Sequence, residues 1–121
     1  MYSVKTRKIY LNQFCLECEI GIHDFEIGVK QKVSIDVTLE VSPPLEHDAD
    51  TLFVVDYDYI REGVFALVKG RRYDYQERLC EDIAKVCFAK EDVAAVIVRT
   101  GKPDVYPDCD SVCFEIHATR N

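Results

Sequence analysis

Apolar and polar residues alternate along four stretches of the chain, and a period of two predicts β-strands. The four stretches are residues 8–21, 32–41, 93–101 and 112–117. The alternation slips once in the first stretch, and this slip indicates a bulge near Asn12 and Gln13. The first two stretches flank the loop 21–31, so we expect them to pair as an antiparallel hairpin.

Between the second and third strands the apolar spacing changes to that of two amphipathic helices. The first helix is expected to start at Asp56 as its N-cap and to end at Gly70. The second is expected to start at Asp74, where Glu77 three residues later has the form of a capping box. The residues expected to face the core are Ile60, Val64, Leu67 and Val68 in the first helix and Leu79, Ile83, Val86 and Cys87 in the second.

The order of elements, ββααββ, predicts an α+β fold in which four antiparallel strands form one sheet and both helices cover one of its faces. The chain has 121 residues and no repeat, linker or low-complexity segment, so we expect a single domain over residues 1–121. Such a sheet leaves two edge strands without partners, and oligomers can join such edges. We therefore expect a homo-oligomer.

The composition narrows the class of protein further. With 48% apolar and 31% charged residues, the chain is typical of a globular domain. A net charge of -7 with scattered lysines and arginines argues against nucleic-acid binding, which depends on clustered cations. No apolar run approaches the roughly 20 residues of a membrane span, and no signal segment opens the chain, so we expect a cytoplasmic location.

The spacing of the six cysteines favours free thiols over a metal site or disulfides. Cys15 and Cys18 lie three apart on a predicted strand and therefore face opposite sides of the sheet. Cys80 and Cys87 fall on the apolar face of the second helix, where packing explains them. The histidines are scattered, without the spacing of metal ligands: His23, His47 and His117. We expect no metal.

Four segments contain polar residues that packing does not require. These are Glu26 in the loop after the first strand, Tyr57 and Glu77 at the two helix starts, and Lys102 after the third strand. Each has a simpler interpretation. The loop can be a plain hairpin and Lys102 a solvated charge; Glu77 can be a helix cap. Tyr57 competes with Tyr59, and either ring can serve only for packing.

In their order and spacing, the four segments together resemble the dihydroneopterin aldolase family. The matching motifs are Gly21-x4-Glu26-x4-Gln31, Val55-x-Tyr57, Glu77-x-Leu79-x-Glu81-x-Ile83-Ala84, and Lys102-Pro103-Asp104-Val105 before Val112-x-Phe114-Glu115-Ile116. The resemblance covers residues 8–120. Two segments differ from the commoner pattern: Glu19-Ile20 stands where many members have an aromatic residue and histidine, and Ser111-Val112-Cys113 where they have a Gly-Val-Gly-like strand.

The resemblance implies a T-fold subunit whose sheets join edge to edge into a tetrameric barrel, commonly stacked in pairs as an octamer, with the site at a subunit interface. It also implies the reaction: retro-aldol cleavage of 7,8-dihydroneopterin into 6-hydroxymethyl-7,8-dihydropterin and glycolaldehyde, in folate biosynthesis. This cleavage uses neither a cofactor nor a metal, because the N5=C6 imine of the pterin accepts the electrons and the enzyme moves protons.

By the same resemblance, three residues are assigned to catalysis. Lys102 is assigned to acid–base chemistry near N5 and the side-chain hydroxyl. Tyr57, from a neighbouring subunit, is assigned to proton transfer with the departing aldehyde and the enamine. Glu26 would orient the lysine, a water or the diol chain.

The pterin ring is assigned chiefly to Glu77, whose carboxylate can accept hydrogen bonds from both the 2-amino group and N3–H. Gln76 and Val55 are assigned to substrate binding with it, and Glu26 contributes to both roles.

Two other functions fit the same residues. The first is epimerisation at C2′ of dihydroneopterin or its triphosphate, by cleavage and re-addition. A triphosphate needs a cationic pocket, and Arg71-Arg72 is the only adjacent arginine pair. The second is a non-catalytic oligomeric scaffold or pterin-binding protein that has kept the fold.

Overall fold

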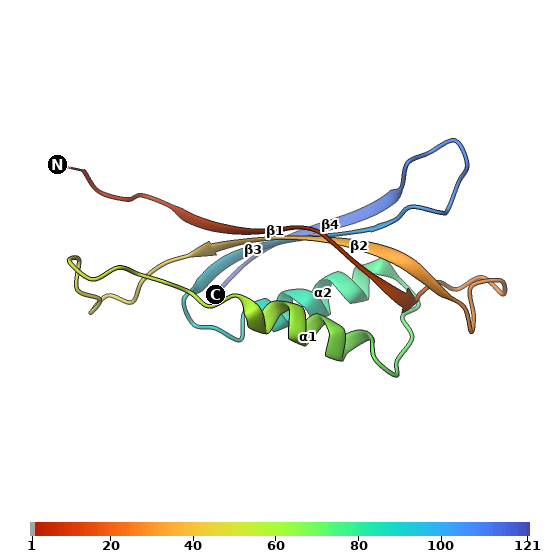
Figure 1. Ribbon diagram of the computed structural model, residues 1–121, viewed down its shortest axis with the longest axis horizontal. Helices are drawn as coiled ribbons and strands as arrows, with labels where there is room; N and C mark the ends of the chain where they lie inside the picture. The colour runs from red at the N-terminus through yellow and green to blue at the C-terminus, as the bar shows by residue number, and fades with distance from the viewer. Residues whose placement is uncertain (1) are drawn as a thin grey trace.

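The computed structural model describes residues 2–121. It shows a four-stranded antiparallel sheet with two helices on one face. The elements are β1 (Arg7–Glu19), β2 (Lys30–Val41), α1 (Asp58–Val68), α2 (Gln76–Cys87), β3 (Val93–Lys102) and β4 (Val112–Thr119). The strands are hydrogen-bonded in sequence order, so β1 and β4 form the two edges. The predicted α+β class and element order are confirmed (Figure 1).

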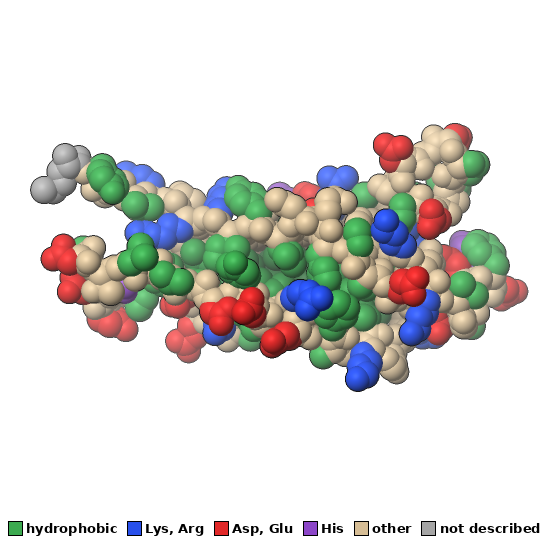
Figure 2. Space-filling view, viewed as in Figure 1, with side chains coloured by type: hydrophobic (Ala, Val, Ile, Leu, Met, Phe, Trp, Pro, Cys, Tyr) green, Lys and Arg blue, Asp and Glu red, His purple; other side chains and the backbone are tan. Residues whose placement is uncertain are grey.

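The core lies between the sheet and the helices. Alternate residues of β2, from Val33 to Val41, are buried against the helices, and the residues between them face outward. From the helices, Ile60, Val64, Leu79 and Ile83 are buried in the same layer. Apolar side chains also reach the surface along the seam between sheet and helices (Figure 2). The predicted buried faces of β2 and of both helices are therefore confirmed, with Leu67 and Val68 partly buried against the core and Val86 only partly buried.

Both helices begin one or two residues later than predicted. Tyr57, and not Asp56, is the N-cap of α1; the Asp56 carboxylate instead accepts a hydrogen bond from the Asp58 N–H at 2.9 Å. The capping box predicted from Asp74 is wrong. Tyr75 is the N-cap of α2, with no side-chain cap, because the Asp74 carboxylate pairs with Arg72. Glu77 therefore does not serve as a cap.

The predicted bulge in β1 is confirmed. The pairing with β2 shifts between Leu11 and Phe14, and Gln13 adopts a left-handed backbone with φ of 52°. The Gln13 N–H leaves the strand ladder and donates to the carboxylate of Asp36 on β2 at 2.8 Å. The Gln13 side-chain amide donates to the same carboxylate. This pair holds the extra residue in place without breaking the sheet.

Cys15 and Cys18 face opposite sides of the sheet, as predicted. Cys18, Cys80 and Cys87 are buried, Cys15 is exposed, and all six cysteines are free. Neither helix of residues 2–121 has the length and apolar character needed to cross a membrane.

The bulge gives a first prediction. Asp36→Ala removes the acceptor of the Gln13 N–H and should lower the free energy of unfolding by about 1–2 kcal/mol, the scale of a lost hydrogen bond to a charged group. Urea unfolding measures the loss. Thr38→Ala, at the next outward position of β2, is the matched control. Equal losses in the two variants would show that the bulge does not depend on Asp36.

Candidate functional site

The end of β1 is tied directly to the chain before α2. The Tyr73 N–H donates to the Glu19 carbonyl and the Gly21 N–H donates to the Tyr73 carbonyl, both at 2.9 Å. The Tyr73 ring is buried, and its hydroxyl donates to Asp82 of α2 at 2.8 Å. These contacts bring the loop after β1 beside the start of α2, although they are about fifty residues apart.

Arg72 strengthens this junction with three contacts. Its guanidinium donates to the Glu19 carboxylate at 2.9 Å and also contacts the Asp74 carboxylate and the Gly21 carbonyl. The Arg72 guanidinium therefore contacts all three segments at once: the end of β1, the turn at Gly21 and the chain before α2. Sequence reasoning considered Arg72 only as a possible phosphate ligand, because nothing in the sequence indicates which carboxylates it meets.

A cleft of about 390 Å³ lies at this junction. Its walls come from the loop after β1, the start of α2 and the segment that follows β3. The predicted site residues that line it are Glu26, Gln76, Glu77 and Lys102. An apolar and aromatic rim, which sequence reasoning missed, consists of Ile22, Phe25, Tyr75, Val105 and Tyr106. The cleft thus unites three segments that are distant in the sequence.

Lys102 and Glu26 form a buried ion pair in the wall of this cleft. The Lys102 ammonium donates to Glu26 Oε2 at 2.6 Å, and their side chains are only 12% and 8% exposed. The interpretation of Lys102 as a solvated charge is therefore wrong. Gln31 donates to the same Glu26 oxygen at 3.1 Å and to the Ile20 carbonyl at 2.6 Å, so it is a second donor that fixes the carboxylate.

The Glu26 carboxylate lies directly against the Cα of Gly21, in the space that a side chain at position 21 would occupy. Gly21 has φ of +124°, and a Cβ built on it would lie 2.1 Å from the Glu26 carboxyl carbon. A side chain at position 21 would displace the carboxylate from its hydrogen bonds, and the backbone conformation also disfavours one. The His23 N–H completes the shell with a 3.3 Å hydrogen bond to Glu26 Oε1. The loop 21–31 therefore encloses the carboxylate of its own Glu26 and is not a plain hairpin.

The electrostatics of Glu26 follow from this shell. Burial alone would raise the pKa of Glu26, because water no longer stabilises its charge. The hydrogen bonds from Lys102, Gln31 and His23 and the charge of Lys102 outweigh burial and lower the pKa from its ordinary 4.5 to about 2. Glu26 is therefore ionised at neutral pH.

The start of α2 presents two residues of different character. The Gln76 side chain lies within the protein: its amide donates to the Val112 carbonyl at 3.1 Å and accepts from Thr100 at 2.7 Å. It therefore fastens α2 to β3 and β4. Glu77 is exposed in the single chain and lines the cleft. Its carboxylate makes no helix-capping hydrogen bond.

The remaining two predicted residues do not line the cleft. Tyr57 is 57% exposed and borders a different cavity with Ile9 and Leu11 of β1, near the start of α1. Val55 packs against the core of its own chain. The Tyr59 ring also packs there, and its hydroxyl donates to the Cys87 carbonyl at 2.8 Å. Of the two competing tyrosines, Tyr57 is thus exposed and Tyr59 serves for packing.

The family model for dihydroneopterin aldolase (FolB) matches residues 9–117, which is nearly the whole chain. The chain belongs to the dihydroneopterin aldolase family. A dihydroneopterin aldolase of Streptomyces coelicolor is 36% identical over 85 residues, which are 69% of this chain and 71% of that one. The Escherichia coli dihydroneopterin aldolase is 25% identical over 96 residues, 78% of this chain and 79% of that one.

Solved structures of the dihydroneopterin aldolase family have the same fold. One from Burkholderia, bound to guanine, is 36% identical and has a TM-score of 0.75, covering 96% of this chain and 93% of that one. The E. coli enzyme in complex with neopterin is 23% identical, with a TM-score of 0.76 over 93% and 98% of the two chains. The second likeness concerns the fold alone.

The ion pair predicts a specific dependence of stability on pH. Because the folded pKa of Glu26, about 2, lies below the ordinary 4.5, folding favours the ionised form. Its contribution to the free energy of unfolding is complete above about pH 4.5 and is lost as the pH falls toward 2. The difference in unfolding free energy between wild type and Glu26→Gln should therefore shrink on acidification.

Urea unfolding at a series of pH values measures this difference. Glu17→Gln, which changes an exposed carboxylate on β1, is the matched control. Parallel pH curves for wild type and Glu26→Gln would contradict the ion pair.

Proposed function

We infer that this chain is a dihydroneopterin aldolase, a lyase that cleaves 7,8-dihydroneopterin into 6-hydroxymethyl-7,8-dihydropterin and glycolaldehyde. The observation that best supports this function is the buried Lys102–Glu26 pair in the wall of a cleft that Glu77 also lines. A buried ammonium, held by a carboxylate that is itself fixed, suits proton transfer more than solubility or packing.

The reaction needs protons moved at three atoms. A base removes the proton of the 2′ hydroxyl, the C1′–C2′ bond breaks, and its electrons enter the N5=C6 imine, which takes a proton at N5. A second proton then reaches C1′ and completes the hydroxymethyl product. We assign the proton transfers at N5 and the hydroxyl to Lys102, and the orientation of its ammonium to Glu26, which contacts it at 2.6 Å.

We assign recognition of the pterin ring to Glu77. Neither oxygen of its carboxylate caps the helix, so both can accept hydrogen bonds. The pterin presents two adjacent donors, the 2-amino group and N3–H. Gln76 supports this role indirectly, since its side chain holds the start of α2 against β3 and β4. The aromatic rim of Phe25, Tyr75 and Tyr106 offers apolar surface for the flat ring.

The charge of the cleft favours an unphosphorylated substrate. Its carboxylates outnumber its one lysine: Glu26, Asp74, Glu77 and Asp104 line it with Lys102. The only adjacent arginines are already paired with carboxylates of this chain, Arg71 with Asp82 and Arg72 with Glu19 and Asp74. This distribution disfavours the triphosphate form of the epimerase alternative.

The proposal includes a homo-oligomer, a tetramer or octamer, with the site between subunits. Two observations support it. Strands β1 and β4 are both edges with unpaired backbone groups, and copies joined edge to edge would satisfy them. Tyr57 lies outside the cleft of its own chain, beside a partly apolar cavity that includes residues of edge strand β1, and Val55 also lies outside the cleft. A neighbouring copy can therefore supply Tyr57 for proton transfer with the aldehyde.

A cytoplasmic location completes the proposal. It is supported by six cysteines that are all free, since reduced thiols are typical of that compartment.

Incubation of the protein with 7,8-dihydroneopterin should release glycolaldehyde and 6-hydroxymethyl-7,8-dihydropterin, identified by chromatography and mass spectrometry. Lys102→Met should lower turnover by ~100-fold or more, on the scale of acid–base catalysis, and change pterin affinity by less than about tenfold. Lys30→Met, which removes an exposed lysine, is the control. Recovery of only the 2′ epimer would indicate an epimerase, and full turnover in Lys102→Met would remove this lysine from the mechanism.

Glu77→Gln tests the ring anchor. The glutamine amide places a donor where the pterin also presents one, so product affinity should fall at least ~30-fold, the lower end of the cost of breaking a paired charge contact. The melting temperature should stay near that of wild type, because Glu77 caps nothing and is exposed. Calorimetry and thermal unfolding check the two results against Glu81→Gln, an exposed position on α2. Unchanged affinity would exclude Glu77 as the anchor.

A further inference from the structure

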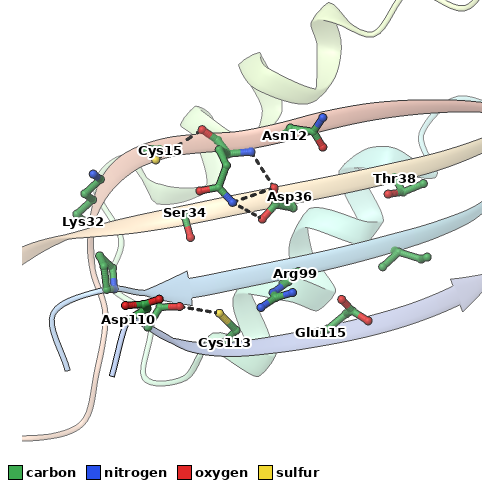
Figure 3. Close-up of a pocket in the computed structure, with 14 residues that line it drawn as sticks. Asn12, Cys15, Lys32, Ser34, Asp36, Thr38, Arg99, Asp110, Cys113 and Glu115 are labelled. Carbon is green, nitrogen blue, oxygen red and sulfur yellow. Dashed lines mark hydrogen bonds between the residues drawn. The ribbon is translucent and has the colours of Figure 1, made fainter. Parts of the chain in front are cut away.

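Two exposed cysteines, Cys109 in the segment that joins β3 to β4 and Cys113 on β4, contact the same serine. The Cys109 thiol donates to the Ser111 carbonyl at 3.1 Å, and the Cys113 sulfur lies 3.2 Å from the Ser111 hydroxyl oxygen. Figure 3 shows Cys113 on β4, on the sheet face away from the helices, with Arg99 of β3 beside it. None of these groups takes part in the proposed aldol chemistry.

The surroundings of Cys113 favour the reactive thiolate. The hydrogen bond with Ser111, together with the Arg99 guanidinium, outweighs partial burial and lowers the pKa of Cys113 below its usual value. In three other thiols burial is the largest effect and the pKa is raised: to about 11 in Cys18, to about 12 in Cys87, and also in Cys80. A thiol oxidant should therefore select Cys113 over these three.

The other exposed thiol on this face cannot reach Cys113 within one chain. Cys15 lies on β1 and Cys113 on β4, with β2 and β3 between them (Figure 3). Three strand spacings amount to roughly 14 Å, far beyond the length of a disulfide. Cys109 is only four residues from Cys113, in a segment of turns and bends, and both sulfurs already contact Ser111.

We propose that Cys109 and Cys113 form a reversible disulfide when the protein meets a hydroperoxide. The Cys113 thiolate attacks a peroxide oxygen, the O–O bond breaks, and the sulfur becomes a sulfenic acid while hydroxide or an alkoxide leaves. The Cys109 thiol then attacks this sulfur, the S–S bond forms, and water leaves with the thiol proton. The two thiols lose two electrons in total, and the peroxide gains them. A dithiol reductant reverses the step by exchange.

The disulfide would act on the aldolase site through the end of the β3–β4 ladder. Cys113 pairs with Gly101 and Val112 with Lys102, so the two strands hold the lysine segment directly opposite the cysteine. The Cys113 sulfur packs on Gly101, where an added Cβ would lie 3.0 Å from it. The Val112 carbonyl also accepts the hydrogen bond from Gln76 of α2. Drawing Cys113 toward Cys109 therefore displaces Lys102; this consequence, unlike the disulfide itself, rests on the proposed function.

The disulfide is measured without substrate. After brief hydrogen peroxide treatment, intact mass spectrometry should show the loss of two hydrogen atoms per chain, and peptide mapping should join Cys109 to Cys113. Dithiothreitol should restore the original mass. Turnover of 7,8-dihydroneopterin should fall about tenfold in the oxidised protein, as expected for a displaced reacting group, and recover on reduction. The Cys109→Ser variant should form no intrachain disulfide. After the same peroxide treatment it should keep more of its turnover than wild type does.

Cys15→Ser is the matched control, since it removes the other exposed thiol on the same face and should leave both the disulfide and the loss of turnover intact. Three results would overturn the proposal: both thiols still free to an alkylating reagent after peroxide, Cys113 oxidised without pairing to Cys109, or a disulfide from Cys15 of one chain to Cys113 of another. Formation of the Cys109–Cys113 disulfide in a protein without aldolase activity would refute the proposed function alone.

Discussion

The contact between the Lys102 ammonium and the Glu26 carboxylate joins the end of β3 to the loop after β1, two segments 76 residues apart in the chain. Each charge is buried, and each would be costly to bury without the other. Gln31 and the His23 N–H add hydrogen bonds, and the Tyr73 and Arg72 contacts hold the loop where the pair can form. The cleft therefore depends on this pair for the shape of its wall as well as for its charge.

Much of the fold could be predicted from the sequence because its elements follow simple periods. The alternation in residues 32–41 fixed the buried face of β2, and a single slip in the first strand located the bulge at Gln13. The helix starts were less predictable. Asp56 and Asp74 are both good capping residues, but the first makes a local turn with Asp58 and the second meets Arg72, a tertiary contact that no local rule contains.

The site was predicted only in part, for a similar reason. Glu26, Glu77 and Lys102 were assigned by resemblance, and the structure brings all three to one cleft. Their local sequences could not distinguish a solvated lysine from a buried one, because burial depends on a partner far along the chain. The aromatic rim and the structural role of Arg72 were missed, since exposed aromatic residues and a single arginine give no periodic signal. Tyr57 was assigned to a neighbouring subunit, and in the single chain it lies outside the cleft.

The close approach of Gly21 to Glu26 has a consequence for how this site can change over evolutionary time. A methyl group at position 21 would overlap the carboxylate, so the two positions share one small volume. A larger residue at 21 becomes acceptable only if the acid at 26 is shortened or lost, and the shortened acid then no longer reaches Lys102. Enlarging position 21 first displaces the carboxylate, and shortening residue 26 first loses its contact with Lys102, so either change alone should break the ion pair. Relatives that lost the lysine would be the ones free to lose the glycine.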